Sequence, residues 1–283
     1  MTAAPPTAYE PVTSVTDHGT TRDGLVQMRR RWRPAGQARG AVLLLHGIAE
    51  HGGRYEHVGR RLADAGFDTV AIDHRGYGQS GGRRGHVDRW SQFSDDVQDQ
   101  LAEVRSLGLP TILLGHSMGG LMATRYCVDT DRPQPDLLVL SGPALEAEIP
   151  SHLRIAAPLI GRLAPKFEIK EDGDPSFLAT DPKVGEVFYA DPFRVPYPTA
   201  RLGWELMRAM EHAHANVANI TIPTLVMHGS DDRLVPVSSS EVFESLPNAE
   251  RIVYEGLRHE IFNEAEGLEI VDTAIAWIDK NLS

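Results

Sequence analysis

The sequence predicts an α/β fold with a mostly parallel central sheet flanked by helices. Short apolar runs alternate along the chain with segments of helical spacing, an order typical of parallel sheets. The run Ala41–Leu45 is apolar throughout, as expected of a strand covered on both faces. The third observation is Gly115–Gly119, GHSMG, which follows an apolar run and precedes a helical one. At 283 residues, the chain suits one such domain with a large insertion.

The elements follow from periodicity, and glycines mark several of their ends. Val58 and Leu62 share one helical face in the segment 54–66, which Gly66 ends, and Phe93 and Val97 do the same within 91–107. The predicted strands are 25–32, 41–46, 67–72, 111–114, 136–141, 224–227 and 251–254. The remaining predicted helices run from residue 118 through Cys127 and over 268–278. A Pro-rich tail precedes the first strand.

The alternation stops between Ser141 and Pro223. Prolines there break up short apolar stretches, which predicts an inserted cap, or lid, subdomain. We therefore expect a core in two parts, 1–145 and 219–283, with the cap at 146–218. The apolar cap residues suit the wall of a pocket, and they equally suit a small helical subdomain with a core of its own.

Composition excludes several classes of partner. Acidic residues outnumber basic ones 39 to 28, and the formal charge of −11 disfavours nucleic acid. The basic run Arg29–Arg33 is best explained as the exposed face of a strand. Cys127 is the only cysteine, so no disulfide forms within the chain. Residues 1–20 lack the pattern of a signal peptide and no segment has the ~20 apolar residues of a membrane span, so we expect a cytoplasmic protein, at most peripheral to a membrane.

Three residue types in a fixed chain order indicate nucleophilic catalysis. Ser117 stands at the centre of the GxSxG turn, and a serine hydroxyl needs an imidazole base and a carboxylate to orient that base. Asp231 and Asp232 follow the strand 224–227, and spacing alone leaves either as the acid. His259 follows the last strand and is the expected base.

An oxyanion intermediate needs two hydrogen-bond donors, usually backbone N–H groups. The expected donors are Met118, directly after the serine, and Ile48, in the turn after the strand 41–46. His212 and His214 lack ligand spacing, and no metal site is expected. The chain has neither a dinucleotide fingerprint nor a P-loop, and hydrolysis requires no cofactor.

Further motifs span most of the chain: HGIAEHGGRY (46–55), DHRGYGQS (73–80), GHSMGG (115–120), TDPKV (180–184), YADP (189–192), HGSDDRLVP (228–236) and HEIFNE (259–264). Together they resemble the monoacylglycerol lipase and lysophospholipase branch of the α/β-hydrolases. The resemblance implies the α/β-hydrolase fold and favours Asp232 over Asp231 as the acid.

The resemblance also implies where substrate binds. Glu50 and Arg54 would lie at the polar end of an acyl pocket, and cap side chains would line its acyl channel. Members often carry a tyrosine three residues before the Asp-Pro pair of the cap, a position held here by Phe188, with Tyr189 next to it. The expected substrate contacts are thus Glu50, Arg54, Leu159, Ile160, Phe188 and Tyr189.

The function expected from the resemblance is release of fatty acid from monoacylglycerols through an acyl-enzyme. Two alternatives stay open: a lysophospholipase or short-chain carboxylesterase with the same triad, and a non-catalytic module that only binds lipid. The apolar stretch 153–160 further suggests transient contact of the cap with micelles or membranes. The oligomeric state does not follow from the sequence.

Overall fold

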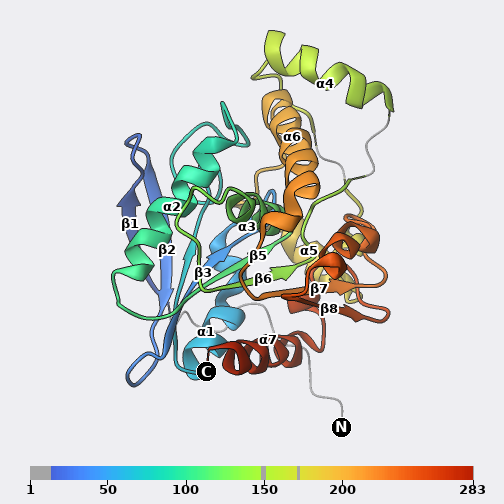
Figure 1. The fold of residues 1–283 in the computed structure, drawn as a ribbon. Helices are drawn as coiled ribbons and strands as arrows, with labels where there is room; N and C mark the ends of the chain where they lie inside the picture. Colours follow the sequence, from blue (N-terminus) through green and yellow to red (C-terminus); the bar gives the residue numbers. More distant parts are fainter. Residues whose placement is uncertain (1–13, 148–150, 171–172, 283) are drawn as a thin grey trace.

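A single sheet of eight strands forms the centre of the molecule (Figure 1). The computed structural model describes residues 14–147, 151–170 and 173–282. The strands are β1 (Val15–Thr20), β2 (Val26–Trp32), β3 (Gly40–Leu45), β4 (Phe67–Ile72), β5 (Thr111–His116), β6 (Leu137–Ser141), β7 (Thr224–Gly229) and β8 (Ala249–Tyr254), in the order β1-β2-β4-β3-β5-β6-β7-β8. Only the pairs β1–β2 and β2–β4 are antiparallel, which confirms the predicted, mostly parallel sheet.

Strand β1 was not predicted. Most of its side chains are exposed, so hydrophobic alternation could not reveal it. Its acidic residue Asp17 pairs with Arg29 on β2 at 2.7 Å, and Glu103 of helix α2 (Ser91–Arg105) pairs with the same arginine. Arg31 is bound by Asp68 at 2.6 Å. Acidic neighbours therefore balance much of the basic run on β2.

Helices cover both faces of the sheet. The side chains of Val42 and Leu44 point to one face, where helices α1 (Glu56–Asp64) and α7 (Gly267–Asn281) pack. Leu43 and Leu45 point to the other, covered by α2 and α3 (Met118–Val128). Cys127 lies in this second core, and burial raises the pKa of its thiol. The alternating sides of β3 thus contribute to both cores.

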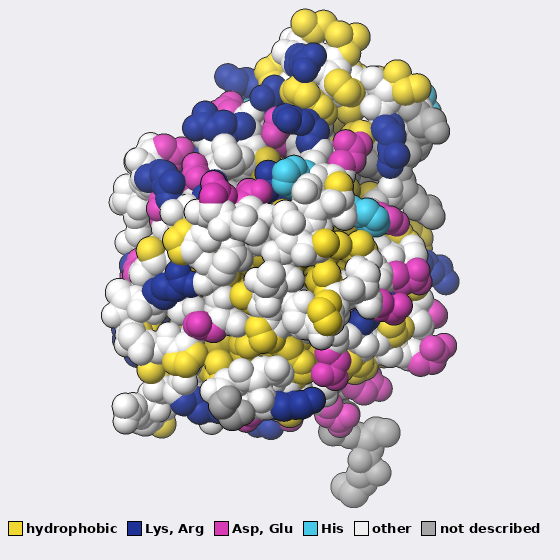
Figure 2. Space-filling model, viewed as in Figure 1, with side chains coloured by type: hydrophobic (Ala, Val, Ile, Leu, Met, Phe, Trp, Pro, Cys, Tyr) yellow, Lys and Arg dark blue, Asp and Glu magenta, His cyan; other side chains and the backbone are white. Residues whose placement is uncertain are grey.

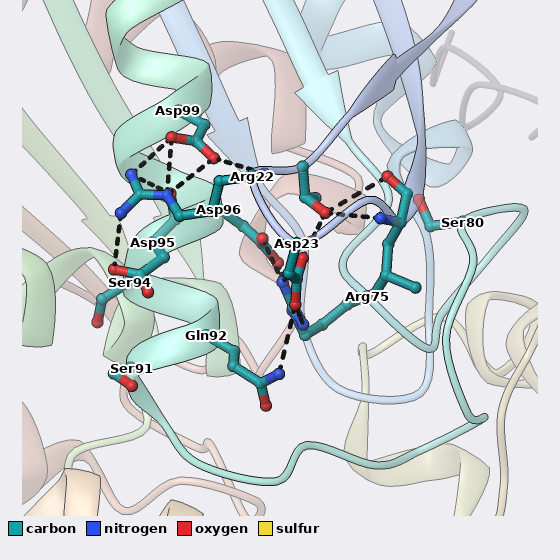
Figure 3. A network of polar contacts seen from close by, with 12 residues as sticks. Arg22, Asp23, Arg75, Ser80, Ser91, Gln92, Ser94, Asp95, Asp96 and Asp99 are labelled. Carbon is teal, nitrogen blue, oxygen red and sulfur yellow. Dashed lines mark hydrogen bonds and ion pairs between the residues drawn. The ribbon is translucent and has the colours of Figure 1, made fainter.

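A buried arginine joins the β1–β2 hairpin to α2 (Figure 3). Arg75 follows β4 and pairs with Asp96 of α2 at 2.6 Å and with Asp23 of the hairpin turn at 2.9 Å. Beside them, Arg22 pairs with Asp99 at 2.6 Å. These pairs fix the antiparallel edge of the sheet against the helix that supports it.

The segment between β6 and β7, here called the insertion, is mainly helical. It contains α4 (Ser151–Leu163), α5 (Pro182–Ala190) and α6 (Ala200–Asn216), with short 3-10 helices at Pro175–Phe177 and Val217–Asn219. Between β6 and β7, the described residues hold no strand beyond a bridge between Glu168 and Thr199. Figure 1 shows α4 and α6 rising above the sheet. The boundaries between the insertion and the core, at residues 146 and 218, remain a prediction.

Helix α6 was not assigned from the sequence. It begins directly after Pro198, where the Thr199 side chain accepts a hydrogen bond from Leu202 N. Ala209 is buried in the core and Trp204 against α4, whereas His212 and His214 are both more than two-fifths exposed. Within the described part of the chain, no helix is long and apolar enough to cross a membrane.

Candidate active site

Ser117 occupies a sharp turn between β5 and α3. Its backbone is in an unusual region, with φ 53° and ψ −117°, and its N–H donates to the Ser141 carbonyl at 3.0 Å. The flanking glycines permit the turn: a Cβ on Gly115 would lie 2.4 Å from the Gly119 carbonyl oxygen, and one on Gly119 2.2 Å from that of Leu45. This is the strained strand-to-helix turn that exposes a nucleophilic serine.

Asp232 and His259 come from loops that follow β7 and β8. The Asp232 Oδ2 atom lies 2.6 Å from His259 Nδ1, and Oδ1 accepts from the backbone N–H groups of Leu234 and Val235, each at 2.9 Å. Asp231, in contrast, is exposed and its carboxylate accepts from Ser230 Oγ. The geometry thus places Asp232, and not Asp231, against the imidazole.

The electrostatic environment suits a base oriented by a carboxylate. Burial would raise the pKa of Asp232, yet the neighbouring His259 and the other donors hold it below its ordinary value. Burial would lower the pKa of His259, and the carboxylate of Asp232 raises it above the ordinary value instead. His116, beside them, has its pKa lowered to about 3, first by burial and then by His259.

The serine turn lies at the same edge of the sheet as this pair. The His116 ring is 4.8 Å from the His259 ring. A Cβ on Gly142 would lie 3.3 Å from His259 Nδ1, and two residues further on the Ala144 N–H donates to the Ser117 carbonyl at 3.1 Å. The three residues expected to form a triad therefore lie at one edge of the sheet, after β5, β7 and β8.

The expected oxyanion donors flank Ser117. Met118 is the first residue of α3. A Cβ on Gly47 would lie 3.2 Å from Ser117 Cβ, so the turn that carries Ile48 passes directly beside the serine. Both backbone segments are thus near the space where a substrate carbonyl would lie.

Glu50 and Arg54 belong to a buried polar cluster, with Tyr55 and Glu260. Arg54 donates to Glu50 Oε2 at 2.6 Å and to both oxygens of Glu260, at 2.6 and 2.8 Å. The second Glu50 oxygen accepts from Tyr55 OH at 2.7 Å and from Gly47 N. This cluster joins the turn that carries Ile48 to the residue after His259.

The two carboxyl groups of this cluster have pKa values shifted in opposite directions. Burial, together with the nearby Glu260, raises the pKa of Glu50. Burial would raise the pKa of Glu260 as well, but its two-fold contact with Arg54 lowers it. The cluster accordingly keeps Arg54 charged in the interior.

Residues of the insertion contact the same turn. His51 Nδ1 accepts from Gly53 N, so Nε2 carries the hydrogen that it donates to Asp191 Oδ2, 2.9 Å away. The Val195 N–H donates to the Ala49 carbonyl at 3.0 Å. Ala49 has φ 64°, rare for a residue with a side chain, and this bond supports it.

The four expected contacts from the insertion separate into two pairs. Phe188 is buried on α5, where its ring packs under Arg54 at 4.8 Å, and Tyr189 lies next to it, 4.4 Å under Arg194. Leu159 and Ile160 lie on α4, where 62% and 38% of their surface is exposed. Phe188 and Tyr189 are therefore near the turn that carries Ala49, whereas the α4 pair faces outward.

A groove of about 390 Å³ opens between α4, α6 and the loop after β6. Its lining is Leu145, Glu146, Ala147, Arg154, Met207, Met210, Glu211, His214 and Ala215. Leu145 follows Ala144, which bonds the Ser117 carbonyl, so one end of the groove begins near the serine. The described residues contain no group of three His, Cys, Asp or Glu side chains that could hold a metal ion.

Two residues of the site were missed from the sequence. Glu260 follows the expected base, and His228 ends β7 with its Nε2 atom 3.1 Å from Asp232 Oδ2. Both lie within the motifs that carried the resemblance. A polar side chain at the buried end of an apolar strand is a signal that could have identified His228.

The strained serine turn, the carboxylate–imidazole pair and the sheet order define an α/β-hydrolase. The sequence pattern of a protein family described as "Serine aminopeptidase, S33" matches residues 36–266. This match covers most of the chain, which therefore belongs to that family of hydrolases.

Two related sequences and one solved structure are similar to the chain over most of its length. The chain is 38% identical to the monoacylglycerol lipase of Mycolicibacterium smegmatis, over 89% of this chain and 92% of the relative. It is 29% identical to phospholipase YtpA of Bacillus subtilis, over 84% and 95%. The crystal structure of the Paleococcus ferrophilus monoacylglycerol lipase superposes with a TM-score of 0.81 at 30% identity, over 89% of this chain and 98% of that one.

These comparisons confirm the resemblance and the fold class. The chain is an ester-hydrolysing enzyme, and not the non-catalytic lipid-binding module that the sequence left open.

Proposed function

We propose that this enzyme is a monoacylglycerol lipase with Ser117, His259 and Asp232 as its catalytic triad. Ser117 Oγ attacks the ester carbonyl carbon while His259 accepts the hydroxyl proton, and Asp232 holds the imidazole in the required tautomer. The resulting oxyanion is bound by the N–H groups of Ile48 and Met118. His259 returns the proton to the leaving glycerol oxygen, and water then hydrolyses the acyl-enzyme by the same route.

The observation that carries this proposal is the 2.6 Å contact between Asp232 Oδ2 and His259 Nδ1 at the edge that holds the strained Ser117 turn. It leaves Nε2 as the ring nitrogen free to serve the serine. The pKa of His259, raised above its ordinary value, suits a base that works close to neutral pH.

Two further features support a substrate with one long apolar chain. The groove beside α6 offers Leu145, Met207 and Met210, next to the polar side chains of Glu146, Arg154, Glu211 and His214, and its volume lies within the roughly 300–1,000 Å³ typical of small-molecule pockets. Relatives named as monoacylglycerol lipases match the chain across most of its length. We assign the groove to the acyl chain, and the insertion, as a cap, to its walls.

In this proposal the chief role of Glu50 and Arg54 is to hold the turn that carries Ile48 in place. Both Glu50 oxygens are occupied inside the protein, one by the Gly47 N–H. A glycerol head group would then lie above the cluster, near Phe188 and Tyr189, where the tyrosine common at position 188 is replaced by a phenylalanine.

The test is fatty-acid release from a panel of monoacylglycerols, with diacylglycerol, lysophosphatidylcholine, a short soluble ester and an aminoacyl anilide for comparison. Monoacylglycerols should give the highest kcat/KM, and Ser117→Ala should lower kcat by about 10⁴-fold or more. Ser106→Ala, which changes an exposed serine at the end of α2, is the matched control and should behave as wild type.

The panel separates the remaining alternatives. A preference for lysophosphatidylcholine would make the enzyme a lysophospholipase, and a preference for the short ester a general carboxylesterase. Full activity in Ser117→Ala would reject the mechanism itself.

We also propose that α4 contacts the lipid surface from which substrate is drawn. Figure 2 shows hydrophobic side chains gathered over α4 with basic ones among them. The exposed fraction reaches 80% for Ile155 and 77% for Leu163, and Leu159 lies on the same helix. An exposed apolar surface flanked by cationic side chains is typical of helices that rest on a membrane.

Polar substitution tests this contact. The double variant Leu159→Ser, Ile160→Ser should lose vesicle binding and activity on micellar substrate while keeping activity on a soluble ester. Leu268→Ser, at an exposed position of α7, is the control. Unchanged vesicle binding in the double variant would refute the contact.

A further inference from the structure

The carboxylate of Asp232 has two imidazole neighbours. His259 lies at 2.6 Å and His228 at 3.1 Å, both from the same oxygen, Oδ2. The first is the base of the proposed triad, whereas the second has no role in the mechanism above. His228 is fully buried at the end of β7.

The partners of His228 determine which nitrogen carries hydrogen. Nε2 faces Asp232 Oδ2 and the Val235 carbonyl at 3.2 Å, and both are acceptors only. Nδ1 faces Ser240 Oγ at 3.0 Å, a hydroxyl that can donate or accept. Nε2 therefore carries a hydrogen and donates it to the carboxylate, whichever way the hydroxyl proton points.

The far side of the ring is held equally firmly. Ser240 Oγ accepts from Arg251 Nε at 2.8 Å and lies 2.9 Å from the Val237 carbonyl. Arg251, on β8, also donates to the Val237 carbonyl at 3.0 Å. The chain of contacts thus runs from Arg251 through Ser240 and His228 to Asp232.

From this arrangement we infer that His228 is a positioning residue that tunes the base through Asp232. Its Nε2 hydrogen bond holds the carboxylate rotamer and draws charge away from the oxygen that faces His259. Less charge on that oxygen stabilises the His259 imidazolium less. His228 therefore keeps the base unprotonated at a lower pH than Asp232 alone would allow.

His259 has other titratable or charged neighbours besides Asp232. They are Glu260, Glu50 and Arg54 in the buried cluster and His116, whose ring is 4.8 Å from that of His259. None of them forms a hydrogen bond to Asp232 in the described structure. A change at His228 should thus reach His259 through the carboxylate.

This inference rests on the proposed function, and its test is the pH dependence of kcat/KM on a soluble chromogenic ester. His228→Leu removes the donor, so the pKa of the free base should rise and the acid limb should move upward by roughly half a unit to one unit. His228→Gln can present an amide N–H to the same oxygen and should leave the limb close to wild type.

Controls and a second readout separate tuning from a structural effect. His18→Leu and His18→Gln, at an exposed position of β1, should not move the limb. The downfield proton resonance of the His259–Asp232 hydrogen bond should shift in His228→Leu and not in His228→Gln. An acid limb that stays at the wild-type pH in folded His228→Leu, or that moves equally far in His228→Gln, overturns the inference.

If His228→Leu does not fold, His228→Phe decides in its place. The phenyl ring occupies the space of the imidazole without a donor, so an upward shift of the limb supports the inference and an unchanged limb overturns it. Failure of the proposed function is recognised separately, because Ser117→Ala would then retain activity.

Discussion

Arg54 donates to both carboxylate oxygens of Glu260, the residue that follows His259 in the chain. The same guanidinium bonds Glu50, which holds the Gly47 N–H beside Ser117. One buried arginine thus links the turn on one side of the nucleophile to the loop that carries the base.

Loss of this arginine should be costly. Arg54→Leu would leave the carboxylates of Glu50 and Glu260 buried without their cation, and we expect unfolding free energy to fall by about 3–5 kcal/mol. Urea denaturation of wild type and variant measures this loss of unfolding free energy. Arg61→Leu breaks an exposed ion pair with Asp272, and it should lower the unfolding free energy by less than about 1 kcal/mol. Equal losses in the two variants would contradict the role given to Arg54.

The turn beside the nucleophile should not tolerate a methyl group. A Cβ on Gly47 would lie 2.8 Å from Glu50 Oε1, an atom that Tyr55 also holds, and 3.2 Å from Ser117 Cβ. Gly47→Ala should therefore displace the turn and lower kcat by about 10²-fold or more. Gly36→Ala adds a methyl where nothing lies within 4 Å and should leave kcat unchanged. Wild-type kcat in Gly47→Ala would refute the packing argument.

Stability should fall in mild acid because of His74. Its Nε2 lies 2.8 Å from the His46 carbonyl, Nδ1 is buried without a partner, and burial lowers the pKa to about 4. The folded state therefore binds fewer protons than the unfolded state, whose histidine titrates near pH 6.5. The stabilisation is complete above about pH 6.5 and is lost towards pH 4, by about 1.4 kcal/mol per pH unit.

A histidine replacement isolates this contribution. His74→Gln can keep an N–H towards the His46 carbonyl and cannot gain a proton, so its unfolding free energy should vary less steeply between pH 6.5 and pH 4. His18→Gln should show the wild-type slope. Parallel curves for wild type and His74→Gln would exclude His74 as the source.

The groove beside α6 should set the preferred acyl length. Met210 lines it and is only half-buried, so Met210→Trp should fill part of its volume of about 390 Å³. We expect kcat/KM to fall about tenfold or more for long-chain monoacylglycerols and to change little for a short ester. A uniform loss across chain lengths would argue that the chain binds elsewhere.

The sheet and the serine turn could be predicted because their signals are local. Mostly apolar runs mark β3 to β7, and GHSMG lies between one such run and a helix. The proximity of Asp232 and His259 follows from their places after two strands of the same sheet. Exposed β1 carries no comparable signal. Helix α6 does have helical periodicity, but it follows a segment rich in prolines, which indicated irregular chain.

The buried contacts of the site could not be read from the sequence. Arg54 and Glu260 are 206 residues apart, and only the fold brings the 3-10 helix Gly52–Tyr55, which carries Arg54, against the loop after β8. The resemblance implied that Glu50 and Arg54 lie near a head group. It did not indicate that they bond each other and Glu260, because a motif identifies residues and not the atoms that those residues contact. His228 lies directly after the predicted strand 224–227, and nothing in its spacing indicates its contact with Asp232.

Two hydrogen bonds, between His51 and Asp191 and between the Val195 N–H and the Ala49 carbonyl, connect the insertion to the turn beside Ser117. They limit how the insertion could be exchanged between related enzymes. A chimera that received the insertion of a relative would keep these contacts only if that insertion places a carboxylate at position 191 and a backbone N–H at position 195 against the turn at 47–51. An insertion without them would leave the turn beside Ser117 unsupported, even with the sheet and the triad intact. An exchange intended to change substrate preference could then also lower catalytic activity.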